Sequence, residues 1–322
     1  MNTDTIETID ITPLFGQDLS LKLQVADRIS RICRRHGFFQ ITGHRIENLK
    51  SFTEQALRFF KTLSHEEKMQ LASSRFNPNN ANKYRGYFPA TVNGKEGFDI
   101  GNPFLTPDNQ LVKSNVLFNE LSVWPSEHLL PNFKDFFQNV YAQMTNLAKV
   151  LLKGFALAAG QDEHFFDDKI RVDDTMSTLR LNYYPFLENI EAVEVAEDGT
   201  RLGCETHRDG TLVTILYQPI EGLQVEDDVA GWIDVPPSES NFVINTGALM
   251  SRWTNGVFKA ANHRVKFVNM ERVSVPFFTE PYFYCPIESF TPKNSAQSLL
   301  NETVIYGNYL IESNKKFKEY QN

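Results

Sequence analysis

The sequence predicts a single, mainly β domain, a barrel or jelly roll with helices packed on it. Two observations lead to this fold class. From about Ser177 onward, short runs rich in Val, Ile, Thr, Tyr and Phe alternate with turn residues. Before that point, apolar residues recur at helical spacing. No linker separates the two parts, and the chain contains no internal repeat. We therefore expect the helices to pack on the β core.

Most of the first 170 residues have a helical pattern. Apolar residues at helical spacing predict helices over 21–33, 52–60 and 133–151, and Gly37 follows the first as a stop signal. Ser64 and Glu67 have the spacing of a capping box, which predicts a further short helix. Residues 38–42 look like one early strand. Residues 79–101 are polar, rich in Gly and Asn and without a period, so we expect a long loop there.

The second half supplies the strands of the predicted core. Strands are expected over 178–184, 211–217, 242–246, 263–268 and 273–278. Turn residues stand between them, at Gly222, Gly231, Gly247 and Asn255-Gly256.

Composition and charge exclude several classes of function. The chain has 322 residues, 41% of them hydrophobic, which is enough for a sizeable core. Its 32 Lys and Arg against 40 Asp and Glu give a net charge of −8, so we expect no nucleic-acid or membrane partner. The basic cluster Arg31, Arg34 and Arg35 fits the solvated face of a helix. Three scattered Cys without a C-x-x-C motif, and no evident signal peptide, predict a cytoplasmic protein with reduced thiols.

The strongest candidate for chemistry is a set of metal ligands. His207 and Asp209 form an H-x-D motif, and alternate residues of a strand share one face, so both can reach one ion. Arg208 would then point the other way. His263 lies 54 residues after Asp209 in another strand-like run. Two imidazoles and one carboxylate leave the other coordination positions of an ion open, which is the ligand set of oxygen-activating iron(II).

These three residues also have interpretations that involve no iron site. An H-x-D motif occurs by chance, and His263 alone fits an ordinary strand histidine. A structural zinc site would need four closed ligands, usually with Cys, and Cys204 is the single thiol nearby.

A second motif, after His263, also indicates a functional site. Arg272 and Ser274 form R-x-S nine residues after His263, so on a strand they present a guanidinium and a hydroxyl on one face. The planar fork of an Arg can bind both oxygens of a carboxylate. A solvated strand Arg is the alternative for Arg272 on its own. Together with the His and Asp residues, the pair predicts an acid-binding site.

The chain resembles a known family, the isopenicillin N synthase-like group of iron oxygenases. This group includes many 2-oxoglutarate-dependent dioxygenases. The resemblance covers nearly the whole chain. It rests on Ile9-Asp10-Ile11, Gly37-Phe38-Phe39, the TILYQ run that ends at Gln218, Leu223-Gln224-Val225, INTGALM, KAANHRVKFVN, ERVSVPFF and Tyr306-Gly307-Asn308-Tyr309-Leu310.

The resemblance implies a fold and a site. The fold would be a double-stranded β-helix, or jelly roll, within one domain over 1–322. A helical N-terminal region would occupy 1–170, the iron and 2-oxoglutarate core 171–290, and a helical tail 291–322. Iron(II) would be bound inside the barrel by His207, Asp209 and His263.

The resemblance also implies roles for further residues. The 2-oxoglutarate enzymes of the group commonly carry N-Y-Y-P, whose Asn and second Tyr contact the cosubstrate, and this chain has Asn182-Tyr183-Tyr184-Pro185. Arg272 and Ser274 would hold the far carboxylate of 2-oxoglutarate. The synthase-like oxidases have an Arg for a substrate carboxylate where this chain has Tyr84, followed by Arg85.

These observations predict an iron(II)- and 2-oxoglutarate-dependent oxygenase that uses O2 to hydroxylate, desaturate or cyclise a small molecule. Arg180 shares a strand face with Asn182 and would add positive charge to the pocket, although a surface Arg fits equally. Arg85 and Arg180 suggest an acidic substrate, such as an amino acid or a peptide. Two alternatives remain: a synthase-like iron oxidase that uses no 2-oxoglutarate, and a binding protein on the same scaffold without turnover.

Overall fold

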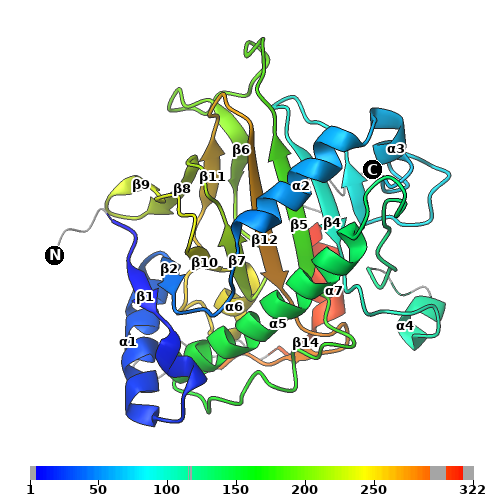
Figure 1. Ribbon diagram of the computed structural model, residues 1–322. Coiled ribbons are helices and arrows are strands. Elements are labelled where there is room, and N and C mark those ends of the chain that lie inside the picture. The colour runs from blue at the N-terminus through cyan, green and yellow to red at the C-terminus, as the bar shows by residue number, and fades with distance from the viewer. Residues whose placement is uncertain (1–4, 115, 117, 291–301, 315–322) are drawn as a thin grey trace.

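A computed structural model describes residues 5–114, 116, 118–290 and 302–314 (Figure 1). Two sheets form the core, and in every neighbouring pair except β1 and β2 the strands are antiparallel. The large sheet has eight strands, in the order β1 (Thr8–Asp10), β2 (Phe38–Thr42), β10 (Phe242–Thr246), β7 (Val213–Tyr217), β12 (Arg272–Thr279), β5 (Thr178–Tyr184), β4 (Glu96–Ile100) and β3 (Gly86–Phe88).

The small sheet has four strands and shares a cavity with the large one. Its order is β6 (Leu202–His207), β11 (His263–Lys266), β8 (Leu223–Asp227) and β9 (Gly231–Asp234). β13 (Pro286–Ile287) and β14 (Val304–Ile305) form a separate ribbon. From β5 to β12 the chain passes back and forth between the two sheets: β5, β7, β10 and β12 belong to the large sheet, and β6, β8, β9 and β11 belong to the small one. This arrangement confirms the predicted jelly roll.

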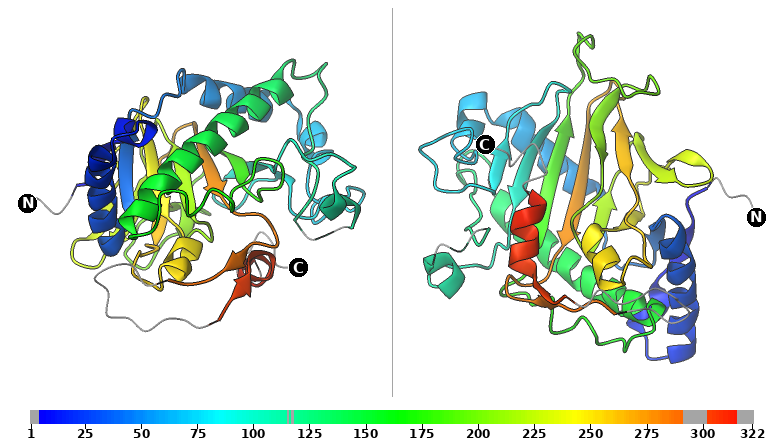
Figure 2. Two further views of the ribbon diagram at one scale, coloured as in Figure 1. Left: turned by 90° about the horizontal axis from the view of Figure 1, so that it is seen from below. Right: turned by 180° about the vertical axis from the view of Figure 1, so that it is seen from behind.

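Helices cover the outer face of the large sheet, where α2 and α5 run across the strands (Figures 1 and 2). The helices are η1 (Thr12–Phe15), α1 (Leu19–Arg35), α2 (Lys50–Thr62), α3 (His65–Met69), α4 (Gln110–Lys113), α5 (Phe133–Ala158), α6 (Ala248–Trp253) and α7 (Tyr306–Asn314). Ser64 caps α3 in the predicted capping box with Glu67. Of the predicted tail 291–322, α7 is described, whereas 291–301 and 315–322 lie outside the described residues.

Two apolar clusters differ in size and place. The larger one joins the helices to the outer face of the large sheet and is rich in aromatic rings, such as Phe59 and Phe98 with 4.3 Å between their centroids. The smaller one lies between the sheets and includes Phe38, Val225 and Val265. Most of the unusually frequent Phe therefore stabilises the packing of helices on the sheet, and the space between the sheets keeps a cavity.

One expectation from the sequence is wrong. Residues 79–101, expected as a loop, contain β3 and β4. β4 pairs with β5 along its whole length, and Phe98 and Ile100 on one of its faces are buried in the helix-packed core. The strand was missed because two apolar residues are too short a pattern, and because Asp99 between them forms an ion pair with Arg180 inside the protein.

No helix within the described ranges combines the length and apolar character that a bilayer crossing requires. Cys33, Cys204 and Cys285 are free thiols.

Candidate active site

The structure brings the three predicted metal ligands together at one end of the small sheet. His207 is the last residue of β6, and His263 is the first residue of β11. The two are direct partners in the antiparallel ladder, and their ring centroids are 4.2 Å apart. Asp209 lies beyond the end of β6, so it reaches the site from the following loop and not from the strand itself. Arg208 points outward, where it donates to Asn262.

The three side chains are spaced as ligands of one ion. Oδ1 of Asp209 is 3.7 Å from Nε2 of His207 and 3.5 Å from Nε2 of His263. Ligand atoms bound at about 2.1 Å and at right angles to each other would lie about 3 Å apart. A small inward adjustment of the side chains therefore suffices to hold a metal ion, with the remaining coordination positions facing the cavity.

Hydrogen bonds orient two of the three candidate ligands, Asp209 and His207. Oδ2 of Asp209 accepts from the hydroxyl of Thr214 at 2.6 Å and from Nδ2 of Asn245 at 2.8 Å, which leaves Oδ1 for the histidine side. Nδ1 of His207 lies 2.8 Å from the carbonyl oxygen of Glu205. A proton on that Nδ1 leaves Nε2 as the metal-binding nitrogen, as is usual for histidine ligands with such a partner.

The electrostatics of the three residues favour a cation between them. Burial alone would raise the pKa of the Asp209 carboxyl, but the imidazoles of His263 and His207 hold that pKa well below its usual range. For His207, burial lowers the pKa, and the nearby Cys204 and Asp209 more than offset this and raise it to about 9. The site therefore attracts positive charge, which a proton or a metal ion could supply.

Arg272 and Ser274 line the same cavity, with Arg272 almost fully buried at 3% exposure. One guanidinium nitrogen, Nη1, donates to the carbonyl of Glu221 at 3.1 Å, and the guanidinium carbon lies 4.3 Å from the centre of the Tyr184 ring. Among the described residues, Nε has no hydrogen-bond partner, and no carboxylate lies within ion-pair distance of the guanidinium. Burial lowers the pKa of Arg272 from its usual value. A ligand carboxylate would offset this desolvation.

Asn182 and Tyr184 stand beside this guanidinium. In the ladder between β5 and β12, Tyr184 pairs with Arg272 and Asn182 pairs with Ser274. Nδ2 of Asn182 makes one long hydrogen bond of 3.5 Å to Ser274, and Oδ1 is buried without a partner among the described residues. The side chain of Asn182 is thus left with polar groups that a ligand in the cavity can satisfy.

The three residues expected at the substrate lie in different environments. Arg180 lines the cavity, but Asp99 of β4 binds it through two hydrogen bonds of 2.6 and 2.8 Å. Its charge is therefore compensated within the protein. Tyr84 and Arg85 are not among the cavity-lining residues: Tyr84 packs on Phe118 in the helix-side core, with ring centroids 3.8 Å apart, and Arg85 is buried and donates to Thr178.

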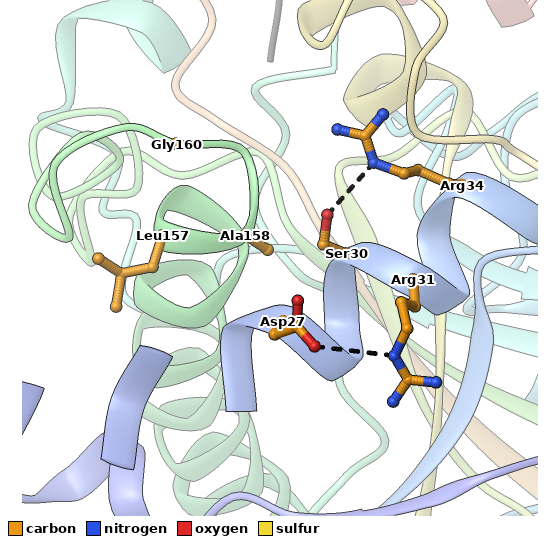
Figure 3. A pocket seen from close by; sticks show the side chains of 7 residues that line it. All are labelled: Asp27, Ser30, Arg31, Arg34, Leu157, Ala158 and Gly160. Carbon is orange, nitrogen blue, oxygen red and sulfur yellow. Dashed lines mark hydrogen bonds and ion pairs between the residues drawn. The ribbon is translucent and has the colours of Figure 1, made fainter. Parts of the chain in front are cut away.

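A separate hollow lies on the surface where α1 meets the end of α5 (Figure 3). Side chains of α1 interact there with one another: Arg34 donates to Ser30 at 3.3 Å, and Arg31 lies 3.8 Å from the carboxylate of Asp27. The hollow shares no lining residue with the cavity of the metal ligands. These contacts fit the solvated helix face that the sequence predicts for Arg31 and Arg34, whereas Arg35 departs from it, because its guanidinium pairs with the buried carboxylate of Asp227 on β8 at 2.7 Å.

Further residues line or shape the cavity, and the sequence predicted no role there for any of them. Thr214 and Asn245 could have been found from polar side chains on the inward face of strands that are otherwise apolar. Cys204 and Lys95 line the cavity as well. Gly222 has a φ of +132°, and a Cβ there would lie 2.5 Å from Nη1 of Arg272, so a glycine is needed to make room for the guanidinium.

A jelly roll that directs two imidazoles and one carboxylate at a single point is the framework of mononuclear non-haem iron(II) enzymes. The family model of the 2OG-Fe(II) oxygenase superfamily matches residues 175–281, and the model described as non-haem dioxygenase in morphine synthesis N-terminal matches residues 6–127. The chain belongs to the isopenicillin N synthase-like family of this superfamily, and it is a non-haem iron dioxygenase or oxidase.

Known relatives match over nearly the full length. Isopenicillin N synthase of Streptomyces clavuligerus is 39% identical over 95% of this chain and 93% of that protein. The enzyme of the same name from Penicillium chrysogenum is 34% identical over 95% of this chain and 93% of that one. The crystal structure of a full-length Neurospora crassa protein in complex with alpha-KG (2-oxoglutarate) and 5-formyluracil has a TM-score of 0.79 at 26% identity and covers 97% of each chain.

These findings confirm the predicted family, enzyme class and cofactors. Iron(II) is the metal of the superfamily, 2-oxoglutarate is bound in crystal structures of the Neurospora crassa protein, and O2 is the usual cosubstrate.

Proposed function

We propose that this enzyme is an iron(II)- and 2-oxoglutarate-dependent oxygenase that hydroxylates, desaturates or cyclises a small molecule. His207, Asp209 and His263 would hold the iron. Arg272, Ser274, Asn182 and Tyr184 would hold 2-oxoglutarate. The iron would bind and activate O2, which is the oxidant, and the keto acid would supply two electrons as it is converted to succinate and CO2.

The observation that supports this proposal best is the buried Arg272. A guanidinium on a side chain only 3% exposed, without a carboxylate partner among the described residues, is unfavourable unless a ligand pairs with it. Ser274 adds a hydroxyl next to it, and Gly222 removes the side chain that would otherwise occupy the space. The same cavity contains the metal ligands, as a ligand that binds both the metal and Arg272 requires.

Asn182 favours a 2-oxoglutarate-dependent reaction over an oxidase reaction that uses no 2-oxoglutarate. Its amide points into the cavity with one weak hydrogen bond and one acceptor without a partner. An unsatisfied buried amide costs about 1–3 kcal/mol. A bound keto acid would present polar atoms to this amide, directly or through water, whereas an apolar substrate group would leave the cost in place.

The second candidate is an oxidase that takes all its electrons from the substrate. The relatives named isopenicillin N synthase, at 34–39% identity, favour this alternative. Arg272 and Ser274 would then bind a carboxylate of the substrate, so these two residues do not separate the two reactions.

The test is succinate formation from 2-oxoglutarate under air, with iron(II) and ascorbate, alongside oxygen uptake with and without 2-oxoglutarate. We expect slow succinate release from the wild type without its substrate and much less from Asn182→Ile. Tyr183→Phe is the control, because Tyr183 packs in the helix-side core on the opposite face of β5. If a substrate drives oxygen uptake and no succinate forms, the oxidase is the correct assignment. Failure of any substrate to drive uptake, with iron bound, would favour the binding protein.

The substrate would be a small molecule that enters beside the metal. Because Asp99 compensates the charge of Arg180, that residue would recognise a substrate through hydrogen bonds from a fixed guanidinium, without adding a full positive charge. We retain an amino acid or peptide as the expected class. Tyr84 and Arg85 would contribute only through the neighbouring structure, since neither lines the cavity.

A further inference from the structure

Cys204 lies inside the cavity of the metal ligands. It is on β6, three residues before His207, and it opposes Val265 of β11 in the small sheet. Its side chain is only partly buried, and it lines the same cavity as the imidazole of His207, with which it interacts. The thiol therefore lies next to a ligand of the metal on which O2 is activated.

The other two thiols differ from Cys204 in their burial and in their distance from the cavity. Cys33 and Cys285 are completely buried, and both belong to the large apolar cluster outside the sheet. Neither lines the cavity. Cys204 is therefore the one thiol in the cavity where O2 would react. Cys33 and Cys285 are thiols outside that cavity, against which its oxidation can be compared.

The surroundings of Cys204 are suited to an oxidised sulfur. Nζ of Lys95 lies 3.6 Å from its Sγ. In the same cavity, Arg272 is only 3% exposed and its Nε has no hydrogen-bond partner among the described residues. An oxygen atom added to the sulfur would be a stronger acceptor than the thiol, and it would meet cationic donors. Sulfur is also more readily oxidised than the rings of Phe38, Tyr184 and Phe278, which line the cavity with it.

We propose that Cys204 is a site of self-oxidation, at which the enzyme transfers one oxygen atom from O2 to its own thiol when no substrate is bound. The inference rests on the proposed use of 2-oxoglutarate. The thiol, 2-oxoglutarate and O2 give a sulfenic acid, succinate and CO2. The keto acid loses two electrons on decarboxylation and the sulfur loses two, which together reduce one O2. One oxygen atom enters succinate, and the other forms the S–O bond and takes up the thiol proton.

A bound substrate would protect Cys204, because it would occupy the space at the metal and consume the oxidising equivalents. The modification would place a polar group beside His207 and Arg272 and thereby disturb the binding of the cosubstrate. Turnover without substrate would accordingly oxidise Cys204 and thereby lower the activity of the enzyme. Thiol reductants would convert the sulfenic acid back to the thiol.

The test uses the full-length iron(II)-loaded protein with 2-oxoglutarate, O2, catalase and dimedone, without further substrate. Digestion and mass spectrometry then locate the dimedone adducts, while succinate is measured in the same samples. We expect at least about tenfold more label on Cys204 than on Cys33 or Cys285. A parallel sample under 18O2 without dimedone should show 18O in any sulfinic acid at Cys204. Omission of 2-oxoglutarate and the Asp209→Ala variant should both suppress the label.

The outcomes separate this inference from the proposed function. Succinate without label on Cys204 overturns the inference and leaves 2-oxoglutarate turnover intact. Label that persists without 2-oxoglutarate or in Asp209→Ala means oxidation by a diffusible oxidant and also overturns it. Absence of both succinate and label refutes the proposed function, and the inference falls with it. Label that depends on 2-oxoglutarate and is absent from Cys204→Ala establishes the site.

Discussion

The two faces of the large sheet are built from the same strands, and they differ in almost every physical property. On β12, Val275 and Phe277 point outward into the helix-packed core, whereas Arg272 and Ser274 point into the cavity. On β7 the same alternation holds, with Ile215 outside and Thr214 inside. The outer residues are apolar and close-packed. The inner residues include polar groups that are buried and incompletely hydrogen-bonded.

This difference shows where the enzyme's stability comes from and where its chemistry would occur. Burial of apolar side chains on the outer face stabilises the sheet, and it holds the strands rigid. The inner face is destabilising by comparison, since buried polar groups without partners cost free energy. A rigid outer face allows the inner face to keep its polar groups oriented for ligands. Substitutions on the two faces should therefore have separable effects.

The largest effect is expected at the metal. Asp209→Ala removes one of the three proposed ligands, so metal-dependent turnover should fall by at least about a hundredfold, more than outer-sphere changes cause. The unfolding midpoint of the metal-free protein should change little, because Asp209 is not part of the apolar core. Iron titration and oxygen uptake measure the first effect, and urea unfolding measures the second. Asp228→Ala, at an exposed carboxylate, is the control. Full activity in Asp209→Ala would refute the ligand assignment.

On the outer face, the corresponding loss is one of stability. Phe277 is fully buried and its ring lies 5.2 Å from that of Tyr141 on α5. Phe277→Ala should lower the free energy of unfolding by about 3–5 kcal/mol through lost burial and the cavity left behind. Ser274→Ala on the inner face should cost less than about 1 kcal/mol. Urea unfolding of the metal-free proteins compares the two. Equal losses would contradict the division of roles between the faces.

Arg272→Lys should have an intermediate effect, confined to ligand binding. Lys keeps the charge and loses the planar fork, so binding of 2-oxoglutarate should weaken by about 1–3 kcal/mol, or roughly 5- to 150-fold. The apparent KM for 2-oxoglutarate in succinate formation is the readout. Arg264→Lys is a matched control, because Arg264 is equally buried but pairs with Asp198 outside the cavity. An unchanged KM in Arg272→Lys would mean that Arg272 faces another group.

The sequence predicted β5, β7, β10, β11 and β12 well, because their runs of strand-forming residues between turns are a local signal, but it did not list β6, β8 and β9 of the small sheet. It also paired His207 with Asp209 through their spacing, although Asp209 proved to lie in the loop after β6. His263 is a ladder partner of His207 across 56 positions, and no local pattern shows this. His263 was proposed as the third ligand from its strand-like run and from the ligand set it completes, and the resemblance to the family implied the same role.

What the sequence did not show are the contacts made by single side chains across strands. Arg180 was expected to add charge to the cavity, but β4, missed in a polar segment, places Asp99 against it. Tyr84 and Arg85 were expected at the substrate from their place in the chain, and they lie outside the cavity lining. Thr214 and Asn245 orient Asp209 from two strands that are distant in the chain from each other. Such contacts depend on sheet order and register, which one sequence leaves open.

The smallest effect gives the sharpest comparison, because one strand contains both members of the pair. Thr214 and Val213 are adjacent on β7 and both buried, but Thr214 faces the cavity and Val213 faces the helices. Val and Thr have nearly the same shape and differ by one hydroxyl. Thr214→Val and Val213→Thr are therefore the same exchange made in opposite directions on opposite faces.

Thr214→Val removes one of two hydrogen bonds to Oδ2 of Asp209 and leaves the one from Asn245. We expect metal affinity to fall by about tenfold, at the lower end for an outer-sphere partner, with no loss of stability in the metal-free protein. Val213→Thr brings a hydroxyl into an apolar core, so unfolding should become easier by about 1–3 kcal/mol while metal affinity stays the same. Iron titration and urea unfolding of both variants form a two-by-two comparison. If Thr214→Val destabilises the protein as much as Val213→Thr and leaves metal affinity unchanged, Thr214 is an ordinary core residue. In that case the orientation of Asp209 depends on Asn245 alone.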